Sequence, residues 1–237
     1  MKLVILAGGY GTRLAEETKI KPKPLVKIGN EPIIWHIMKI YSYYGITKFI
    51  VCLGYKGKML KRQLNSRIKK EDWSIKYIDT GLNTMTGGRI RRIKKFIGKD
   101  KIFLMTYGDG LSDINIKKLI KFHNKKNKIA TLTAVKYRNP KGIVLMDKKS
   151  NVSKMKEKPN EYINGGFYVL SNKIFDLIKN DKNIFEKDCL PILSKKNQLI
   201  GYKHNGFWAC MDTMREKIEL NNIWKSKNKA WKVWKNN

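Results

Sequence analysis

Cysteines and long apolar runs are scarce in this sequence of 237 residues. It has three cysteines and no C-x-x-C pair, which argues against a disulfide scaffold and against structural zinc. No run approaches the roughly 18 apolar residues of a membrane-spanning helix. The amino terminus also lacks the charged and apolar regions of a signal peptide. We therefore expect a cytoplasmic protein with no membrane partner.

Acidic residues are also few, with 19 Asp and Glu against 51 Lys and Arg and a formal net charge of +32. Such a charge is typical of nucleic-acid-binding proteins. Here, however, the cations are mostly lysines spread along the whole chain, without the interleaved stacking aromatics of RNA-binding modules. We expect no specific nucleic-acid partner, and a basic RNA-binding protein stays open as the alternative from another functional class.

The most informative stretch lies near the amino terminus. Residues 3–7 form an apolar run, which is typical of a strand buried on both faces. Three glycines follow between Gly8 and Gly11, and the backbone N–H groups of such a turn can form an anion-binding concavity. Arg13 and Lys23 add two cations nearby. The stretch therefore predicts a site for a polyphosphate.

Two common phosphate-binding patterns do not fit this glycine turn. The P-loop pattern G-x-x-x-x-G-K-[ST] is absent from it. The dinucleotide pattern G-x-G-x-x-G would place Leu14 at its third glycine, and no acidic residue ends the next predicted strand. A plain glycine-rich turn after a first strand stays open as the alternative.

Strand and helix patterns alternate along the first half of the chain. Asn30 is expected to cap a first helix, with Pro32 in its first turn. The other predicted elements are the strands 3–7, 47–53, 73–78 and 101–106 and the helices 57–68, 88–97 and 114–124. This alternation predicts an α/β fold with a mostly parallel sheet and helices on both faces.

The rhythm of the pattern changes near residue 129. The predicted elements of the second half are the strands 129–137, 143–146, 152–157, 166–170 and 199–203 and the helices 172–178, 185–195 and 212–225. No linker rich in Pro, Ser or Gly separates the two halves. We therefore expect one domain, 1–237, whose second half continues the same sheet.

The loop G-G-x-G-T-R-L from Gly8 to Leu14, with K-P-K-P at 21–24, resembles the signature of the sugar-phosphate nucleotidyltransferases. Within that family the chain is most similar to the glucose-1-phosphate cytidylyltransferases. The similarity continues in order through 32–38, 54–57, 79–81, 85–89, 107–110, 164–167, 206–208 and 211–213. It covers nearly the whole chain.

The resemblance implies a Rossmann-like nucleotidyltransferase sheet with a small acceptor-binding β subregion. Residues 1–128 would form the nucleotide-binding half and 129–237 the acceptor-binding half. The implied reaction is a Mg²⁺-dependent transfer of a cytidylyl group from CTP to a phosphorylated acceptor, with glucose 1-phosphate nearest by resemblance. Pyrophosphate would leave, Mn²⁺ could replace Mg²⁺, and the CDP-linked product would serve nucleotide-sugar and surface-polysaccharide biosynthesis. A homo-oligomer is expected.

The chemistry of this reaction explains why cations, amides and a metal are needed. The nucleophile is already an anion, so positioning and electrostatics carry the catalysis. Mg²⁺ prefers one or two protein carboxylates together with substrate phosphates and waters. By resemblance, Asp109 and Asp212 bind the metal. A turn-capping Asp109, or an Asp212 that only caps a helix in a capping box with Thr213 and Glu216, stays open.

The resemblance also assigns the other site residues. Arg13, Lys23 and Asp109 are expected to be catalytic. The expected nucleotide-binding residues are Leu6, Ala7, Gly8, Gly9, Gly11, Thr12, Arg13, Lys23, Thr84, Gly87, Arg89 and Gly108. The expected acceptor-binding residues are Glu157, Lys158, Asn164 and Gly165.

The chain departs from the family pattern in two places. A segment of the family is missing between Gln63 and Trp73. Where relatives commonly carry R-[FY]-G beside the sugar, this chain has Pro-Lys-Gly-Ile-Val at 140–144. Since specificity resides in the site and not in the scaffold, two alternatives stay open. One is a non-hexose acceptor such as a phosphorylated amino acid or amide, and the other is UTP or dTTP in place of CTP.

Overall fold

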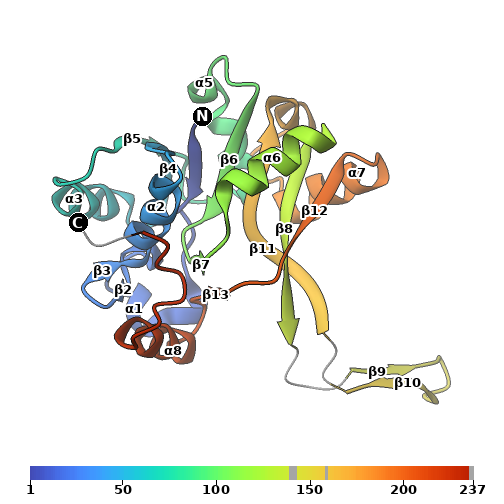
Figure 1. The fold of residues 1–237 in the computed structure, drawn as a ribbon. Helices are drawn as coiled ribbons and strands as arrows, with labels where there is room; N and C mark the ends of the chain where they lie inside the picture. The colour runs from blue at the N-terminus through green and yellow to red at the C-terminus, as the bar shows by residue number, and fades with distance from the viewer. Residues whose placement is uncertain (139–142, 158–159, 235–237) are drawn as a thin grey trace.

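A seven-stranded sheet with the order β12-β8-β11-β6-β1-β4-β5 forms the centre of this computed structural model, which describes residues 1–138, 143–157 and 160–234 (Figure 1). Its strands are β1 (Leu3–Leu6), β4 (Lys48–Leu53), β5 (Ser74–Asp79), β6 (Ile102–Tyr107), β8 (Ala130–Arg138), β11 (Asn160–Ser171) and β12 (Leu199–His204). β11 pairs antiparallel with β6 and β8, and the other pairs are parallel. The prediction of a mostly parallel α/β sheet is confirmed.

Both faces of the sheet are covered, as the fully apolar β1 requires. Leu3 and Ile5 point into one core and Val4 and Leu6 into the other, and all four side chains are buried. The first core contains α2 (Ile33–Tyr43), α3 (Gly57–Arg67), α6 (Ile116–Lys126) and α8 (Met214–Lys225). The second contains α4 (Thr86–Arg92), α5 (Lys94–Ile97), α7 (Leu190–Lys195), the 3-10 helix Asn172–Leu177 and the π-helical turn Phe185–Cys189.

The start of α2 differs from the expectation that Asn30 caps it. Gly29, with φ 62°, and Asn30 instead form the turn between two short antiparallel strands, β2 (Lys27–Ile28) and β3 (Glu31–Pro32). The N-cap of α2 is therefore Pro32, one residue before the helix. A residue that can cap a helix also suits a tight turn, and the strand pairing decides between them here.

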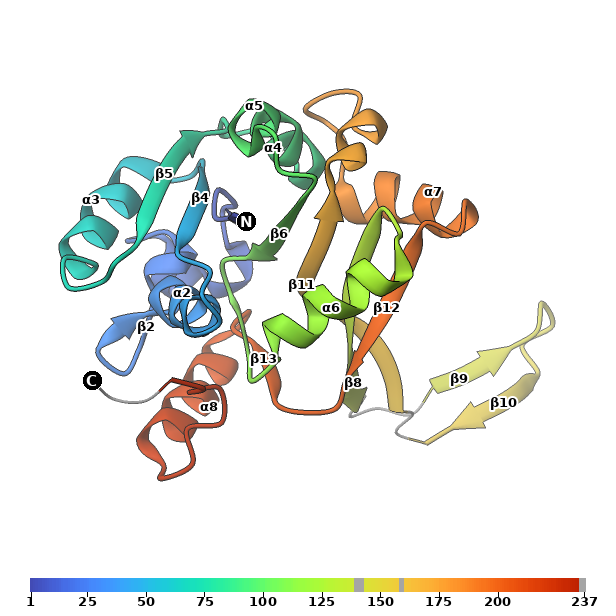
Figure 2. The same cartoon turned by 45° about the horizontal axis from the view of Figure 1, so that its top comes forward.

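Two antiparallel strand pairs lie outside the main sheet and connect its strands to other elements. β9 (Ile143–Met146) and β10 (Val152–Lys156) form a hairpin that projects from the body, which Figure 2 shows clearly. β7 (Gly110–Ser112) pairs with β13 (Trp208–Cys210) and so joins the end of β6 to the start of α8. The remaining short helices are α1 (Ala15–Thr18) and the 3-10 turns Thr12–Leu14 and Lys23–Leu25.

No helix in the described part of the chain is both long and apolar enough to span a bilayer. The carboxyl-terminal segment instead packs on the body through Trp231, which is fully buried beside His36 and Trp224. The Trp231 indole N–H donates to Nδ1 of His36 at 3.4 Å. This aromatic cluster fixes the end of the chain against α2 and α8.

Candidate active site

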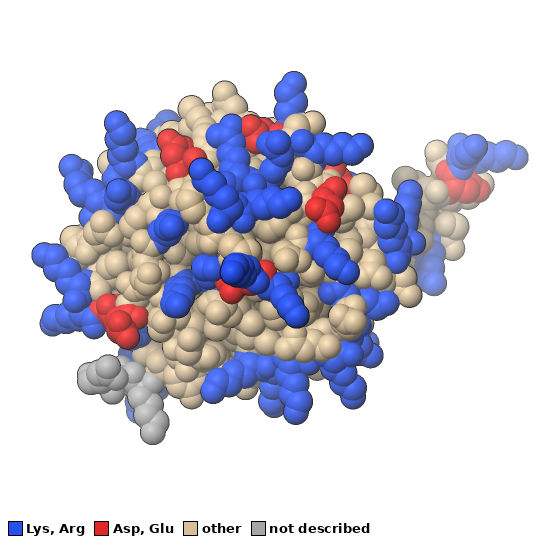
Figure 3. All heavy atoms as spheres, turned by 90° about the horizontal axis from the view of Figure 1, so that it is seen from above, with Lys and Arg blue, Asp and Glu red and all other residues tan. Residues whose placement is uncertain are grey.

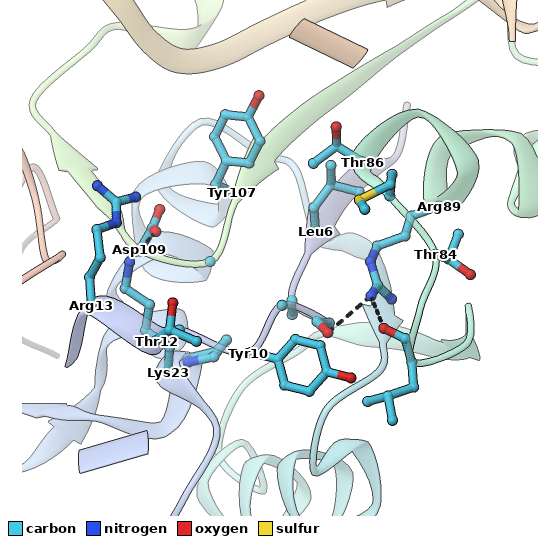
Figure 4. Close-up of a pocket in the computed structure, with 18 of the residues that line it drawn as sticks. Leu6, Tyr10, Thr12, Arg13, Lys23, Thr84, Thr86, Arg89, Tyr107 and Asp109 are labelled. Carbon is cyan, nitrogen blue, oxygen red and sulfur yellow. Dashed lines mark hydrogen bonds and ion pairs between the residues drawn. The ribbon is translucent and has the colours of Figure 1, made fainter. Parts of the chain in front are cut away.

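A cavity of about 530 Å³ opens beside the carboxyl ends of β1 and β6, the edge where α/β folds place their ligands (Figure 4). Its lining residues are Leu6, Ala7, Gly8, Gly9, Tyr10, Gly11, Thr12, Arg13, Lys23, Pro24, Leu82, Asn83, Thr84, Met85, Thr86, Arg89, Tyr107, Gly108, Asp109 and Asp212. The structure therefore gathers the two predicted metal ligands and all predicted nucleotide-binding residues except Gly87 around one cavity.

The three glycines of the loop lie in different surroundings, so the absence of a side chain has a different consequence at each. A Cβ on Gly8 would lie 2.2 Å from the Arg89 guanidinium, so only glycine allows this close approach. Gly11 adopts a left-handed conformation with φ 67° and precedes the 3-10 turn at Thr12. A Cβ on Gly9 would meet no protein atom within 4 Å. At Gly9 the protein thus leaves open space on the cavity wall.

Four charged side chains form the polar centre of the cavity. The Lys23 Nζ lies 2.6 Å from Asp109 Oδ2 and 2.6 Å from Asp212 Oδ1. Arg13 Nη1 lies 2.8 Å from Asp212 Oδ2. Burial by itself lowers the pKa of Lys23, but the charges and hydrogen bonds of both aspartates outweigh it and raise the pKa. Lys23 therefore stays charged, whereas Arg13 extends with 73% of its side chain exposed.

Backbone pairing brings the two aspartates together from distant parts of the sequence. Asp109 follows β6, and its carbonyl accepts the N–H of Met211 at 3.0 Å, next to the β7–β13 pair. The N-cap of α8 is Thr213, whose hydroxyl forms a capping box with Glu216. The alternative that Asp212 is merely the helix cap is wrong, because Thr213 fills that role and the Asp212 carboxylate turns toward Lys23.

Asp109 and Asp212 are also the residues that fit a divalent cation. Their carboxylates converge on one position, now taken by the Lys23 ammonium. The described residues contain no cluster of three or more His, Cys, Asp or Glu side chains suited to a metal. Two carboxylates match the coordination of Mg²⁺, which takes its remaining ligands from substrate phosphates and water.

Arg89 lies in the cavity wall, and both of its terminal guanidinium nitrogens donate hydrogen bonds to the protein. Figure 4 shows the Arg89 side chain in the cavity wall. The side chain is 5% exposed and contacts backbone from three separate segments. Its acceptors are Leu53 O at 3.0 Å, Thr80 Oγ1 at 2.6 Å, Gly81 O at 2.9 Å, Gly8 O at 3.0 Å and Leu82 O at 3.3 Å. Arg89 therefore holds the glycine loop and the 80–82 loop in place while it lines the cavity, and its contact with a nucleotide stays a prediction.

Gly87 lies outside the cavity for a packing reason. Its N–H donates to Asn183 O at 3.0 Å, and a Cβ would approach that carbonyl oxygen to 2.7 Å. Gly87 thus lets α4 pack against the 181–183 loop. Thr84, by contrast, lines the cavity as expected of a nucleotide contact.

Of the predicted acceptor residues, Asn164 and Gly165 precede Gly166, which packs against the Tyr107 ring of the cavity wall. Asn164 Oδ1 accepts the N–H of Gly166 at 3.0 Å, and Gly165 O accepts the indole N–H of Trp208 at 2.8 Å. Glu157 is exposed beside the β10 strand. Lys158 lies outside the described residues. So do residues 140–142 of the segment 140–144, where the chain departs from the family pattern.

Several cavity residues were not anticipated from the sequence. Tyr10 of the glycine loop donates through its hydroxyl to Asn83 Oδ1 at 3.3 Å, across the cavity mouth. Tyr107 and Thr86 both donate to Glu186, which comes from the π-helical turn. The Y-G-D-G motif could have indicated Tyr107, but nothing in the local sequence marks Glu186.

Known proteins resemble this chain over its full length. Residues 2–225 match the family model described as nucleotidyl transferase, so the chain belongs to that family and is an enzyme of this type. It is 42% identical to the glucose-1-phosphate cytidylyltransferase of Salmonella typhimurium over 257 aligned residues, which cover 99% of this chain and 100% of that one.

A further relative has the same name in its description, and a solved structure has a similar fold. The probable glucose-1-phosphate cytidylyltransferase of Bacillus subtilis is 41% identical over 255 residues, covering 99% of this chain and 100% of its own. The crystal structure of HddC from Yersinia pseudotuberculosis superposes with a TM-score of 0.76 at 26% identity, over 94% of this chain and 99% of that one. A divalent metal, a nucleoside triphosphate and a sugar phosphate are general requirements of the family.

Proposed function

We propose that this enzyme transfers the cytidylyl group of CTP to glucose 1-phosphate, forming CDP-glucose and releasing pyrophosphate. The observation that carries the proposal is the convergence of Arg13, Lys23, Asp109 and Asp212 beside the glycine loop. The end-to-end similarity to curated glucose-1-phosphate cytidylyltransferases supports this choice of substrates.

In this proposal the triphosphate lies in the cavity against the loop from Gly8 to Thr12. The loop amides and the Arg13 guanidinium bind phosphate oxygens, and Arg13 stabilises the charge on the departing pyrophosphate. Lys23 leaves the two aspartates to bind the α-phosphate. Asp109 and Asp212 would hold Mg²⁺ or Mn²⁺, which supplies neutralisation of phosphate charge.

The acceptor approaches from the second half of the chain. An oxygen of its phosphate attacks the α-phosphorus of CTP, and the bond between the α-phosphorus and the α–β bridging oxygen breaks, which releases pyrophosphate. Because the attacking phosphate oxygen is already ionised, no protein base is required. We assign residues 1–128 to nucleotide binding and 129–237 to acceptor binding, with Glu157 and Asn164 on sugar hydroxyls, Gly165 beside them, and Lys158 on the acceptor phosphate.

A substrate panel tests the proposal. Pyrophosphate release is measured with CTP, UTP, dTTP and GTP, each combined with glucose 1-phosphate or with phosphorylated amino acids and amides. We expect the fastest release with CTP and glucose 1-phosphate, and a large loss in the Asp109→Asn control. Turnover only with a non-sugar acceptor, which the sequence at 140–144 keeps open, or only with another nucleotide, would reject the proposed substrates.

The same panel of substrates, together with an RNA-binding assay, distinguishes the proposed enzyme from a basic RNA-binding protein without activity. On the face drawn in Figure 3, Lys and Arg side chains are scattered over most of the surface and form no single stripe. Salt-dependent RNA binding without any pyrophosphate release would favour the binding protein.

We also propose that the enzyme works as a homo-oligomer. The β9–β10 hairpin exposes Met146 and Met155 on an arm without a packed core, and a two-stranded hairpin is marginally stable by itself. Sedimentation of the wild type against Met146→Lys/Met155→Lys tests whether this arm contributes to assembly. A wild type that sediments as a monomer rejects the oligomer.

A further inference from the structure

A chain of hydrogen bonds runs from the nucleotide cavity toward the predicted acceptor loop. Glu186 Oε2 accepts the hydroxyl of Thr86 at 2.7 Å, and Glu186 Oε1 accepts the hydroxyl of Tyr107. The Tyr107 and Tyr168 hydroxyl oxygens lie 3.3 Å apart. The side-chain amide of Asn164 donates to the Tyr168 hydroxyl. We call these five residues the Glu186 chain.

The neighbours of the Glu186 chain decide which group donates and which accepts in each of its hydrogen bonds. Asn164 Oδ1 already accepts the N–H of Gly166, so the amide nitrogen must face Tyr168. Tyr168 accepts that bond and donates to Tyr107, and Tyr107 donates to the carboxylate of Glu186. Two donors thus meet on Glu186, which suits an ionised carboxylate.

Both ends of the Glu186 chain touch substrate sites. Thr86 and Tyr107 line the nucleotide cavity, and Figure 4 shows their hydroxyls on the side away from the glycine loop. The Tyr107 ring packs against Gly166, where a Cβ would lie 2.8 Å from it. Gly166 and Asn164 belong to the β11 segment whose pairing with β8 shifts register after Asn164. Tyr107 therefore connects the nucleotide cavity to the segment that carries Asn164.

The two tyrosines of the Glu186 chain remain hydrogen-bond donors, and the Glu186 turn is bonded to α4. Burial raises the pKa of Tyr168 to about 12 and raises that of Tyr107, so both hydroxyls keep their protons as donors. Glu186 sits on the π-helical turn Phe185–Cys189, a geometry frequent at functional sites. The Thr86 hydroxyl accepts the N–H of Phe185 at 2.9 Å while donating to Glu186, which locks α4 to this turn.

We propose that Glu186 is a positioning residue that couples nucleotide binding to acceptor binding, by holding Tyr107 and Tyr168 so that Asn164 faces the acceptor. This inference rests on the proposed function, because it takes Asn164 as an acceptor contact. Coupling between two binding sites is reciprocal, so the acceptor must tighten nucleotide binding by the same factor.

The test compares Glu186→Gln with the wild type. Glutamine keeps the shape but offers one oxygen to two donors, so one hydroxyl must turn away. We expect KM for the acceptor to rise roughly tenfold, the size of one charge-assisted hydrogen bond, while the Kd of CTP alone changes little. The tightening of CTP by glucose 1-phosphate, measured by calorimetry, should be lost. Tyr168→Phe, which cuts the chain without touching Glu186, should act in the same direction.

Asp188→Asn is the matched control, because Asp188 lies on the same turn and its carboxylate accepts the Ile184 N–H at 2.7 Å and the Asn183 side-chain amide, which are not part of the Glu186 chain. The inference is overturned if Glu186→Gln leaves the acceptor KM unchanged, or if Asp188→Asn reproduces its effect at an equal loss of Tm. If the wild type transfers no nucleotide at all, the proposed function fails separately. CTP binding with and without glucose 1-phosphate then still decides the coupling, and wild-type binding without mutual tightening rejects it.

Discussion

The Lys23 ammonium contacts the Asp212 carboxylate at 2.6 Å, although one residue lies near the start of the chain and the other near its end. With Asp109 on its other side, Lys23 occupies the position at which two carboxylates converge. A cation is thus built into the site, and it must move when a divalent ion binds both aspartates.

Lys23→Met should separate the effect of the Lys23 charge on catalysis from its occupation of the position between the two aspartates. The variant removes a cation from the reacting phosphates, so kcat should fall on the order of 10²–10³-fold. It also leaves two unpaired carboxylates, so a divalent ion should bind more tightly to the nucleotide-free protein than to the wild type. Calorimetry with Mn²⁺ alone measures this affinity. Equal Mn²⁺ affinity in both proteins would contradict the convergence on one cation position.

Arg13→Ala should lower kcat by on the order of 10²–10³-fold, the scale of losing one donor to developing charge. Because 73% of the Arg13 side chain is exposed, the Tm should hardly change. Arg215→Ala, which removes an exposed arginine paired with Glu219 on α8, is the control and should keep full activity. Equal loss of activity in both variants would point to a general charge effect.

Asp212→Asn distinguishes a metal ligand from a helix cap. Thr213 and Glu216 form the capping box of α8, so the Tm should stay near that of the wild type. The Mg²⁺ concentration required for half-maximal activity should rise on the order of tenfold or more, since one of two carboxylate ligands is lost. Thr213→Ala should show the opposite pattern, with a lower Tm and an unchanged Mg²⁺ requirement.

Arg89→Met should destabilise the protein and weaken nucleotide binding together. The change leaves buried carbonyls of Gly8 and Leu53 without their donor, so the free energy of unfolding should fall by about 3 kcal/mol. Urea denaturation and the Kd of CTP measure the two effects. Arg62→Met, on the exposed side of α3, is the control. Unaltered stability would contradict the role of Arg89 in holding the cavity wall.

His36 should make stability fall at acid pH. Burial lowers the pKa of His36 from 6.5 to about 4, although hydrogen bonds to backbone oppose the shift. The unfolded chain therefore takes up a proton below about pH 6.5 that the folded protein refuses until about pH 4, which costs about 3 kcal/mol across that range. Urea unfolding at pH 7 and pH 5 should show part of this loss. His36→Gln should remove this part of the pH dependence.

The sequence by itself determined the fold class and predicted where the candidate polyphosphate site lies. The alternation of strand and helix patterns requires a covered parallel sheet, and the run at 3–7 has no face that could tolerate water. Gly8 and Asp109 were identified because local motifs place them just after strands, whose ends meet at one edge of such a sheet, and Arg13 follows Gly8 in the same loop.

Only the tertiary structure decided the roles that depend on distant partners. The turn at Asp212 has two residues able to cap α8, and the pairing of β7 with β13 turns Asp212 toward Lys23. Arg89 holds the cavity wall together because three segments that are distant in sequence supply carbonyl acceptors for its guanidinium. No local sequence pattern identifies Glu186. Its role depends on hydrogen bonds with Tyr107 and Thr86, and only the folded chain brings these residues within hydrogen-bond distance.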